Sequence, residues 1–450
     1  MGNTFGGIIM LTWKRVRTIS ALAFPAGIAL GLTTIMSLID LAMVGRLGTH
    51  AVAAVGLAVF SNTFVMAFVM GIASAVQGLV ARRRGEGSTQ PNCLPLNAGL
   101  LIALLVGLPL TILCYMFTPM LFSAISSDPE VTRVGVPFLR ILYTGIIAVG
   151  MQSAFRGYWY GMEKPKAHMT IVFFMICLNI VGNYLLIFGK LGAPALGATG
   201  AAISTVVSLY VGAIINFELV YFRFRKDGFL SAWPQRSLLA RVFKMGLPLT
   251  MQEFFHSAGY ITFFWIVGQI GTAELAAANV LVRITMALVL LAMSLATASA
   301  TLVSKTVGEG NLEGAAEWGW DSGKLGVIGI SLLGLPLFLF PELFLSIFLS
   351  DPHAMSIAVI PLRLVAATTG LGSLIYIFAY TLYSVGDGKR VVMVSFSTQW
   401  LFFLPAAWIA GPYLKYGLLQ IWLVQMVYGA LATVLITAIW AGGRWKKIKI

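Results

Sequence analysis

The feature that most constrains this chain is a series of long apolar runs, each of sufficient length to cross a lipid bilayer. A transmembrane helix needs about 20 consecutive apolar residues, and backbone in lipid must pair its polar groups internally. The runs are too long and too evenly apolar for barrel strands of about ten alternating residues. They predict an all-α integral membrane protein with 12 transmembrane helices. The runs lie at about 19–44, 51–80, 95–122, 132–159, 167–189, 195–222, 243–270, 275–303, 322–348, 355–384, 391–414 and 417–441.

Composition excludes a soluble protein. Hydrophobic residues make up 59% of the 450 residues and charged residues only 10%, against roughly 45–50% and 25% in soluble domains. The helices and short loops use the chain completely, which leaves no room for a sizeable extramembrane domain. No GxxxxGK[ST], HExxH or GxSxG motif is present. We therefore expect no enzyme activity, no bound cofactor or metal, and no ATP-driven step.

The basic residues lie mostly on one side of the predicted helices. Of the 30 Lys and Arg residues, 23 fall on the side that holds both chain ends. The positive-inside rule places that side in the cytoplasm. We expect a multi-pass protein of the plasma membrane, a monomer in the lipid bilayer, whose net charge of +14 reports topology and not nucleic-acid binding. The seven other basic residues are Arg46, Arg133, Arg140, Lys190, Arg283, Arg363 and Lys415.

The sequence repeats itself at one constant offset. Segment 37–57 (SLIDLAMVGRLGTHAVAAVGL) aligns without a gap to 260–280 (YITFFWIVGQIGTAELAAANV). The same offset relates LVARRRGEG at 79–87 to LVSKTVGEG at 302–310, and the SDP tripeptide at 127–129 to the one at 350–352. Chance does not hold one register over so long a stretch of chain.

The repeat predicts two six-helix lobes. We assign residues 1–222 to an N-lobe, 223–242 to a cytoplasmic linker and 243–450 to a C-lobe. Because six is an even number, the lobes share one orientation and should be related by a pseudo-two-fold axis along the membrane normal. Duplicated bundles of this kind are typical of secondary transporters, in which a cleft opens alternately to the two sides.

Asp40 is the strongest functional candidate. It lies about 21 residues into the first run, or roughly 31 Å along the helix, in the outer half of the bilayer. Intramembrane carboxylates are costly and usually mark an ion path. Helical spacing places Thr33, Met36 and Ser37 on the face of Asp40.

Asn179 and Asn183 supply amides at similar depth in the fifth run, at positions i and i+4 on one stripe. Together with Asp40 they could hold a proton or a small hard cation through oxygen ligands. Membrane-embedded Asn residues also bond neighbouring helices without any transport role. The repeat mate of Asp40 is Phe263, so only one half carries this acid.

Aromatic and methionine side chains suit the binding of flat apolar cations by cation–π attraction and adaptable packing. Most of them must nevertheless face lipid or pack helices. Glu253 is a further intramembrane acid of undecided role, and Glu218 is interpreted as a surface charge. The candidates for the wall of a substrate site are Phe60, Phe64, Met66, Tyr143, Phe255, His256 and Met286.

The sequence resembles the multidrug and toxic compound extrusion (MATE) family over essentially its whole length. The motifs that carry the resemblance are SLIDLAMVGRLGTHAVAAVGL, RRRGEG, LNIVGNYLLIFG, LGATGAAISTVVS, VGQIGTAELAAANV and VGEG. An aspartate in the first helix followed by VG-x-LG looks most like the DinF-like branch. The resemblance implies a V-shaped pair of six-helix lobes that exports amphipathic, often cationic drugs in exchange for protons or sodium. It also implies an N-lobe cation and drug site at Asp40, Asn179 and Asn183.

Two departures from the family pattern affect the mechanism. Asn183 stands where the DinF-like branch usually has an aspartate, which leaves one acid instead of two. The helix-7 glutamate of the NorM-like branch has no certain match, since His256 stands at or near it and Glu253 is displaced. A single carboxylate can bind one proton, whereas a sodium site normally gathers more anionic oxygen, so proton antiport is the leading hypothesis. Sodium-coupled drug antiport, a lipid-linked sugar flippase of the same superfamily and a non-transporting scaffold remain the alternatives.

Overall fold

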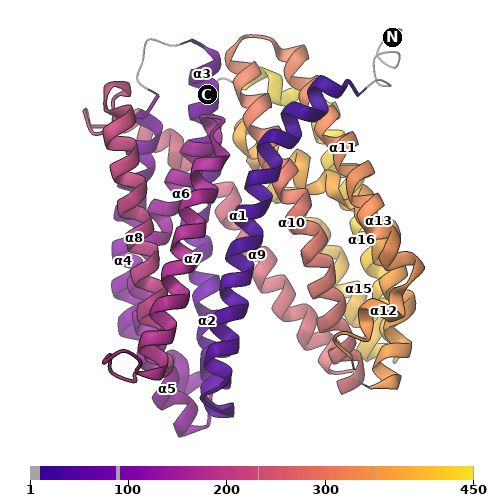
Figure 1. The fold of residues 1–450 in the computed structure, drawn as a ribbon. Coiled ribbons are helices and arrows are strands. Elements are labelled where there is room, and N and C mark those ends of the chain that lie inside the picture. The colour runs from indigo at the N-terminus through magenta and orange to yellow at the C-terminus, as the bar shows by residue number, and fades with distance from the viewer. Residues whose placement is uncertain (1–10, 88–91, 232, 350, 449–450) are drawn as a thin grey trace. The chain divides into compact units, whose positions relative to one another are not determined.

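The computed structural model describes residues 11–87, 92–231, 233–349 and 351–448, and the chain in these ranges is helical without any strand (Figure 1). The all-α prediction is confirmed. The helices are α1 (Trp13–Gly45), α2 (Thr49–Met70), α3 (Ile72–Gly85), α4 (Leu94–Ile125), α5 (Pro129–Thr144), α6 (Ile146–Gly161), α7 (Pro165–Phe188), α8 (Ala198–Phe224), α9 (Arg236–Gly268), α10 (Thr272–Gly308), α11 (Leu312–Leu339), α12 (Pro341–Leu345), α13 (Pro352–Ser384), α14 (Gly388–Phe396), α15 (Leu404–Trp408) and α16 (Leu418–Ala441). A π-helical segment, Ser397–Phe403, connects α14 to α15. A second π-helical segment, Ile409–Tyr413, follows α15 and leads toward α16.

Most of the predicted spans meet the length and apolarity needed to cross a membrane. Ten helical segments of the described chain do so individually, and the pair α5 and α6, bent by 41° at Gly145, does so as a unit. The remaining predicted run falls in α9, which is long enough at 33 residues. Glu253 lies near its centre, and α9 does not by itself meet the apolarity that these ten segments meet.

The helix boundaries repeat with the sequence. The two ends of α9 stand at the repeat positions of the two ends of α1, and α10 and α13 begin at the repeat positions of the starts of α2 and α5. The N-caps of α5 and α13 are the aspartates of the two SDP tripeptides. Asp128 accepts a hydrogen bond from the Glu130 backbone, and Asp351 accepts from His353 and Ala354. One set of local signals therefore starts equivalent helices in both halves. One difference is that α2 and α3 are separated at Gly71, whereas α10 is continuous.

The described residues form two compact units, which are considered separately. The N-unit comprises Ile28–Phe254, and the C-unit comprises the described residues of Met1–Gly27 and Phe255–Ile450. These units differ from the lobes expected at 1–222 and 243–450, because α1 and α9 each contribute to both. The connection between the halves is also shorter than the expected 223–242, since α8 continues to Phe224 and α9 begins at Arg236.

In the C-unit, α13 packs against α10, α11 and α16. The first turns of α1 are held to α11 by ion pairs, in which Arg15 contacts Asp321 and Glu317, each at 2.5 Å. Ile19 and Ala23 then pack against Ala298 and Leu302 of α10. These contacts place the start of α1 with the helices of the second half of the sequence.

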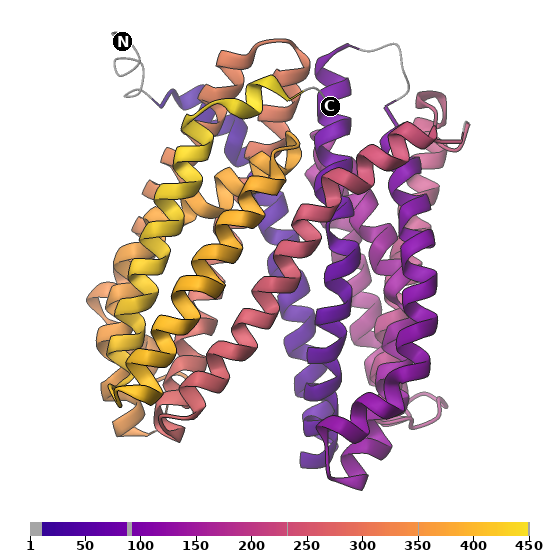
Figure 2. The same ribbon diagram turned by 180° about the vertical axis from the view of Figure 1, so that it is seen from behind.

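In the N-unit, α6 is central and packs against α3, α4, α7 and α8. Figure 2 shows the long α9 along its whole length. The ring centroid of Phe254 in α9 lies 4.4 Å from that of Phe64 in α2. Close approach of α6 to α3 depends on Gly157, where an added Cβ would overlap the carbonyl oxygen of Ala73. The two helix backbones leave no space for a side chain there.

Replacing Gly157 with alanine should destabilise the N-unit by about 1–3 kcal/mol, the usual cost of overpacking a core. The new methyl group meets backbone atoms, which cannot rotate away. The measurement is the thermal unfolding midpoint of the purified protein in detergent. The matched control is Gly56→Ala in α2, where an added Cβ meets nothing within 4 Å. Equal midpoints for both variants would contradict the close α3–α6 contact.

Candidate functional site

Asp40 of the N-unit lies in the last turns of α1, where α7 and α8 approach it. Its side chain is half-buried, and two donors contact the carboxylate. Asn183 Nδ2 donates to Asp40 Oδ1 at 2.5 Å, and Thr205 Oγ1 lies within donating distance of Oδ2, at 3.4 Å. Three helices therefore converge on one carboxylate.

Asn179 links the two residues that contact Asp40. Its Nδ2 donates to Thr205 Oγ1 at 3.2 Å, and its Oδ1 accepts from Asn183 Nδ2 at 3.3 Å. Asn179 and Asn183 are both fully buried, one turn apart on α7. Asp40, Asn179, Asn183 and Thr205 form what we call the Asp40 cluster.

The cluster contains one unused acceptor. Asn183 Oδ1 is buried without a hydrogen-bond partner among the described residues. Buried polar atoms are rarely left unpaired, so each exception calls for an explanation. Rotation of the amide exchanges Nδ2 and Oδ1. Asn183 can thus donate to a carboxylate or accept from a carboxylic acid.

Small and apolar residues bring the three helices into position. Gly182 of α7 faces Ser204 of α8, and an added Cβ would overlap the Ser204 hydroxyl. The Ser204 hydroxyl itself donates to the backbone carbonyl of Asn179 at 2.8 Å. On the other side, Ala29 of α1 packs against Val172 and Ile176 of α7. These contacts pack both α1 and α8 against α7.

The three residues expected on the face of Asp40 behave differently from one another. Met36 packs against the apolar contact between α1 and α7. Thr33 and Ser37 are exposed, and their hydroxyls donate to the Leu30 and Thr33 carbonyls of their own helix. Their hydrogen bonds are therefore local, and neither joins the Asp40 cluster.

The proposed wall residues of the N-unit divide into two groups. Phe60 is exposed, and Phe64 is half-buried against Phe254. Tyr143 and Met66 are only 2% and 6% exposed. Tyr143 and Met66 are enclosed by the packing of the bundle in this structure, and their place in a substrate wall stays a prediction.

Phe255, His256 and Met286 belong to the C-unit, as does Phe263, the repeat mate of Asp40. The ring of Phe255 lies 4.8 Å from that of Phe396, and the ring of His256 lies 4.8 Å from that of Tyr260. Phe263 is buried against Phe403 and Trp422. The position equivalent to Asp40 is thus a hydrophobic core residue in the other unit.

Sequence reasoning missed two polar features. Thr205 stands in the quoted motif LGATGAAISTVVS, but its rotation toward Asp40 could not be read from the sequence. A second buried network joins α6 and α8: Trp159 donates to Asn216 at 2.7 Å, and Asn216 donates to Gln152 at 3.1 Å. The sequence shows each of these polar residues within an apolar run. Helix packing decides which of them form hydrogen bonds with one another.

Comparison with known proteins supports this architecture. The MatE family model matches residues 25–185 and 248–409, two segments that begin at equivalent positions of the repeat. "Probable multidrug resistance protein NorM" of Thermotoga maritima is 25% identical over 436 residues, which cover 95% of this chain and 92% of the relative. "Multidrug resistance protein NorM" of Aliivibrio fischeri is 24% identical over 403 residues, with 88% and 87% covered.

Solved structures agree in fold. A multidrug resistance MATE family transporter of the MOP superfamily, in an outward-facing conformation, matches with a TM-score of 0.86 at 20% identity, over 97% of both chains. The assignment to the DinF-like branch stays a prediction. Because the family model covers most of the chain in both halves of the repeat, the chain belongs to the MatE family.

Proposed function

We propose that this protein is a secondary active antiporter that exports amphipathic, often cationic compounds in exchange for protons, with Asp40 as the coupling carboxylate. The observation that carries the proposal is the Asp40 cluster, which holds one carboxylate between Asn183 and Thr205 inside an apolar helix bundle. Membership of the MatE family and the multidrug resistance names of the relatives support drug export. Those relatives and structural neighbours are resistance proteins and transporters and not enzymes.

Coupling follows from competition for one carboxylate. Deprotonated Asp40 is an anion in a poorly solvated place, where a positively charged compound is attracted strongly. A proton that arrives from the outside neutralises the carboxylate and releases the compound. Loss of that proton toward the cytoplasm restores the anion and the affinity.

Asn183 fits both protonation states of Asp40. In the present arrangement its Nδ2 donates to the carboxylate. After protonation of Asp40, rotation of the amide would turn the unpartnered Oδ1 toward the new carboxylic O–H. The hydrogen bond between Asp40 and Asn183 can therefore persist in both protonation states, while the bond from Asn183 Nδ2 to Asn179 Oδ1 breaks on rotation.

Protons are favoured over sodium because the Asp40 cluster contains only one negatively charged oxygen group. Asp40 is the only acid of the Asp40 cluster, and its carboxylate is already contacted by the Asn183 amide N–H. Sodium and other hard cations prefer several oxygen ligands. The cluster thus suits one proton better than one sodium ion.

The test is dye efflux from proteoliposomes under one imposed gradient at a time. With ethidium as the transported dye, a pH gradient should drive efflux well above protein-free vesicles, and a sodium gradient at equal pH should not. Efflux driven by sodium alone would overturn proton coupling but not drug export.

Two other classes of function have distinct outcomes. A non-transporting scaffold predicts equal ethidium accumulation in cells with and without the protein. A lipid-linked sugar flippase predicts no dye movement but movement of a lipid-linked oligosaccharide. We expect lower ethidium accumulation in cells that contain the protein.

A further inference from the structure

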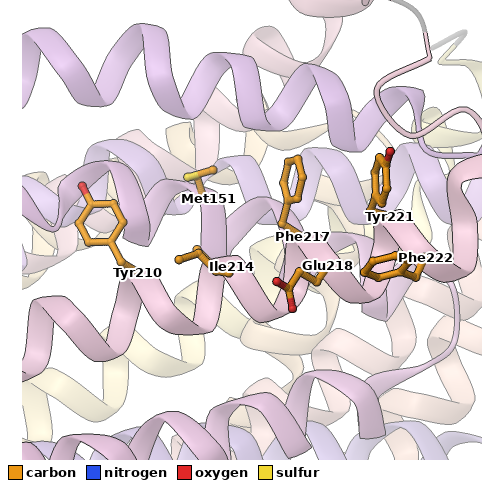
Figure 3. Close-up of a pocket in the computed structure, with 8 residues that line it drawn as sticks. Met151, Tyr210, Ile214, Phe217, Glu218, Tyr221 and Phe222 are labelled. Carbon is orange, nitrogen blue, oxygen red and sulfur yellow. The ribbon is translucent and has the colours of Figure 1, made fainter.

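The N-unit carries an apolar groove on α8, outside the Asp40 cluster. The groove has a volume of about 510 Å³ and is lined by Met151 of α6 and by seven residues of α8 (Figure 3). The spacing of three and four between these α8 residues places them on one face of the helix. They are Tyr210, Ala213, Ile214, Phe217, Glu218, Tyr221 and Phe222.

The groove runs along the membrane-crossing part of the helix. From Tyr210 to Phe222 the rise is about 18 Å at 1.5 Å per residue, close to the roughly 15 Å of hydrocarbon in one leaflet. α8 is long and apolar enough to span a bilayer, and Phe222 is 80% exposed. The groove therefore fits an elongated apolar body that is held within one leaflet.

Glu218 places one negative charge in this apolar surface. Figure 3 shows its carboxylate along the groove between Ile214 and Phe222. Glu218 is exposed and forms no ion pair with the described residues. A carboxylate at membrane depth is costly without a partner. A positively charged group in the groove would supply that partner.

The aromatic rings next to Glu218 also suit a cation. Phe217 and Tyr221 lie nearly parallel, with ring centroids 6.5 Å apart. The guanidinium of Arg225 already lies over the Tyr221 ring, 4.9 Å from its centroid. One face of this aromatic pair thus accepts a cation in the structure.

The order of charges along α8 distinguishes a zwitterionic phospholipid from a simple cationic amphiphile as the occupant of the groove. Arg223 and Arg225 lie at the end of α8, and Glu218 lies more than one turn deeper in the helix. A zwitterionic phospholipid carries its phosphate next to the apolar part and its amine farther out. Along α8 the negative and positive groups follow in the same order, so each charge of such a lipid would face a like charge of the helix. A compound whose ammonium is attached directly to an apolar body matches it.

We propose that the α8 groove binds an amphipathic organic cation from the bilayer, with the ammonium group at Glu218 and the apolar body along Ile214, Phe217 and Tyr210. This site is separate from the Asp40 cluster. Binding at it requires neither transport nor protonation of Asp40, so it can fail or hold independently of the proposed antiport.

The test is photolabelling of the full-length protein in nanodiscs of zwitterionic lipid. The probe is an alkyltrimethylammonium with a diazirine on its chain, and matched probes carry a hydroxyl or a carboxylate head on the same chain. Peptide mass spectrometry should find the ammonium probe on α8 residues 210–222. Glu218→Gln should reduce that labelling about tenfold, the equivalent of one lost charge-assisted contact, and should leave labelling by the hydroxyl probe unchanged.

Two variants control the experiment. Glu342→Gln makes the same change at an exposed acid of α12 in the C-unit and should leave labelling of α8 as in the native protein. Ile214→Trp fills the groove and should reduce labelling by both the ammonium and the hydroxyl probe. The proposal is overturned if Glu218→Gln labels like the native protein, or if the carboxylate probe labels α8 more strongly than the ammonium probe. Protection of α8 from all probes would also overturn it and would indicate a second protein chain on this face.

Discussion

Asp40→Asn should reduce pH-driven ethidium efflux to the level of protein-free vesicles. The amide has the shape of the carboxylate, so the contacts of α1 with α7 and α8 can persist. It neither gains nor loses a proton in the working pH range and carries no charge to attract a cationic compound. Both halves of the proposed exchange therefore fail together. The measurement is the initial efflux rate in proteoliposomes under an imposed pH gradient.

Asp128→Asn is the matched control for this variant. Asp128 caps α5 outside the membrane-spanning helices, and hydrogen bonds from the backbone of Glu130 and Val131 hold the pKa of its carboxyl below the usual range. Asparagine is an equally good N-cap, so this variant should transport at the native rate. If Asp40→Asn keeps native, gradient-driven efflux, the coupling role of Asp40 is refuted.

Asn183→Leu should lower the efflux rate about tenfold while the protein remains folded. The change removes the shorter of the two donors to Asp40 and leaves Thr205, whose hydroxyl lies 3.4 Å from the carboxylate and also 3.0 Å from the Ala201 carbonyl. Loss of a donor to a charged group costs about 1.5–3 kcal/mol, and about 1.4 kcal/mol corresponds to tenfold. The same proteoliposome assay measures the effect, together with the thermal unfolding midpoint.

The control for a positioning role is Asn279→Leu. Asn279 is an exposed residue of α10 whose amide donates to the Leu275 carbonyl of its own helix. The same substitution there should change neither efflux nor the midpoint. Equal efflux by Asn183→Leu and the native protein would show that Asp40 acts without Asn183.

Both predictions concern residues, Asp40 and Asn183, that the sequence alone identifies as functional candidates. Asp40 is prominent because charges are scarce in the runs, and the spacing of Asn179 and Asn183 predicted one face of a helix. The structure places the two amides beside Asp40, as the sequence led us to expect. Their role in coupling stays a prediction until transport is measured.

For other residues, the sequence did not predict the surroundings of the side chain. Tyr143 and Met66 have the chemistry of a drug-binding wall, yet packing encloses them. Glu218 was interpreted as a surface charge, and the structure places it in an apolar groove on α8. Residue type and depth in the membrane indicate which interactions a side chain can make. They do not state which neighbouring helix covers it.

The sequence alone determined the helices, the membrane and the duplication. Apolar runs of bilayer length admit only helices because lipid offers no partners for backbone groups, and the constant offset of the repeat recurs in the helix boundaries. Only the tertiary structure decided that Thr205 joins Asp40, that Gly157 lets α6 reach α3, and that α1 and α9 each contribute to two units. The physical reason is that helical periodicity defines the faces of a helix, whereas the fit of side chains between helices decides which faces meet.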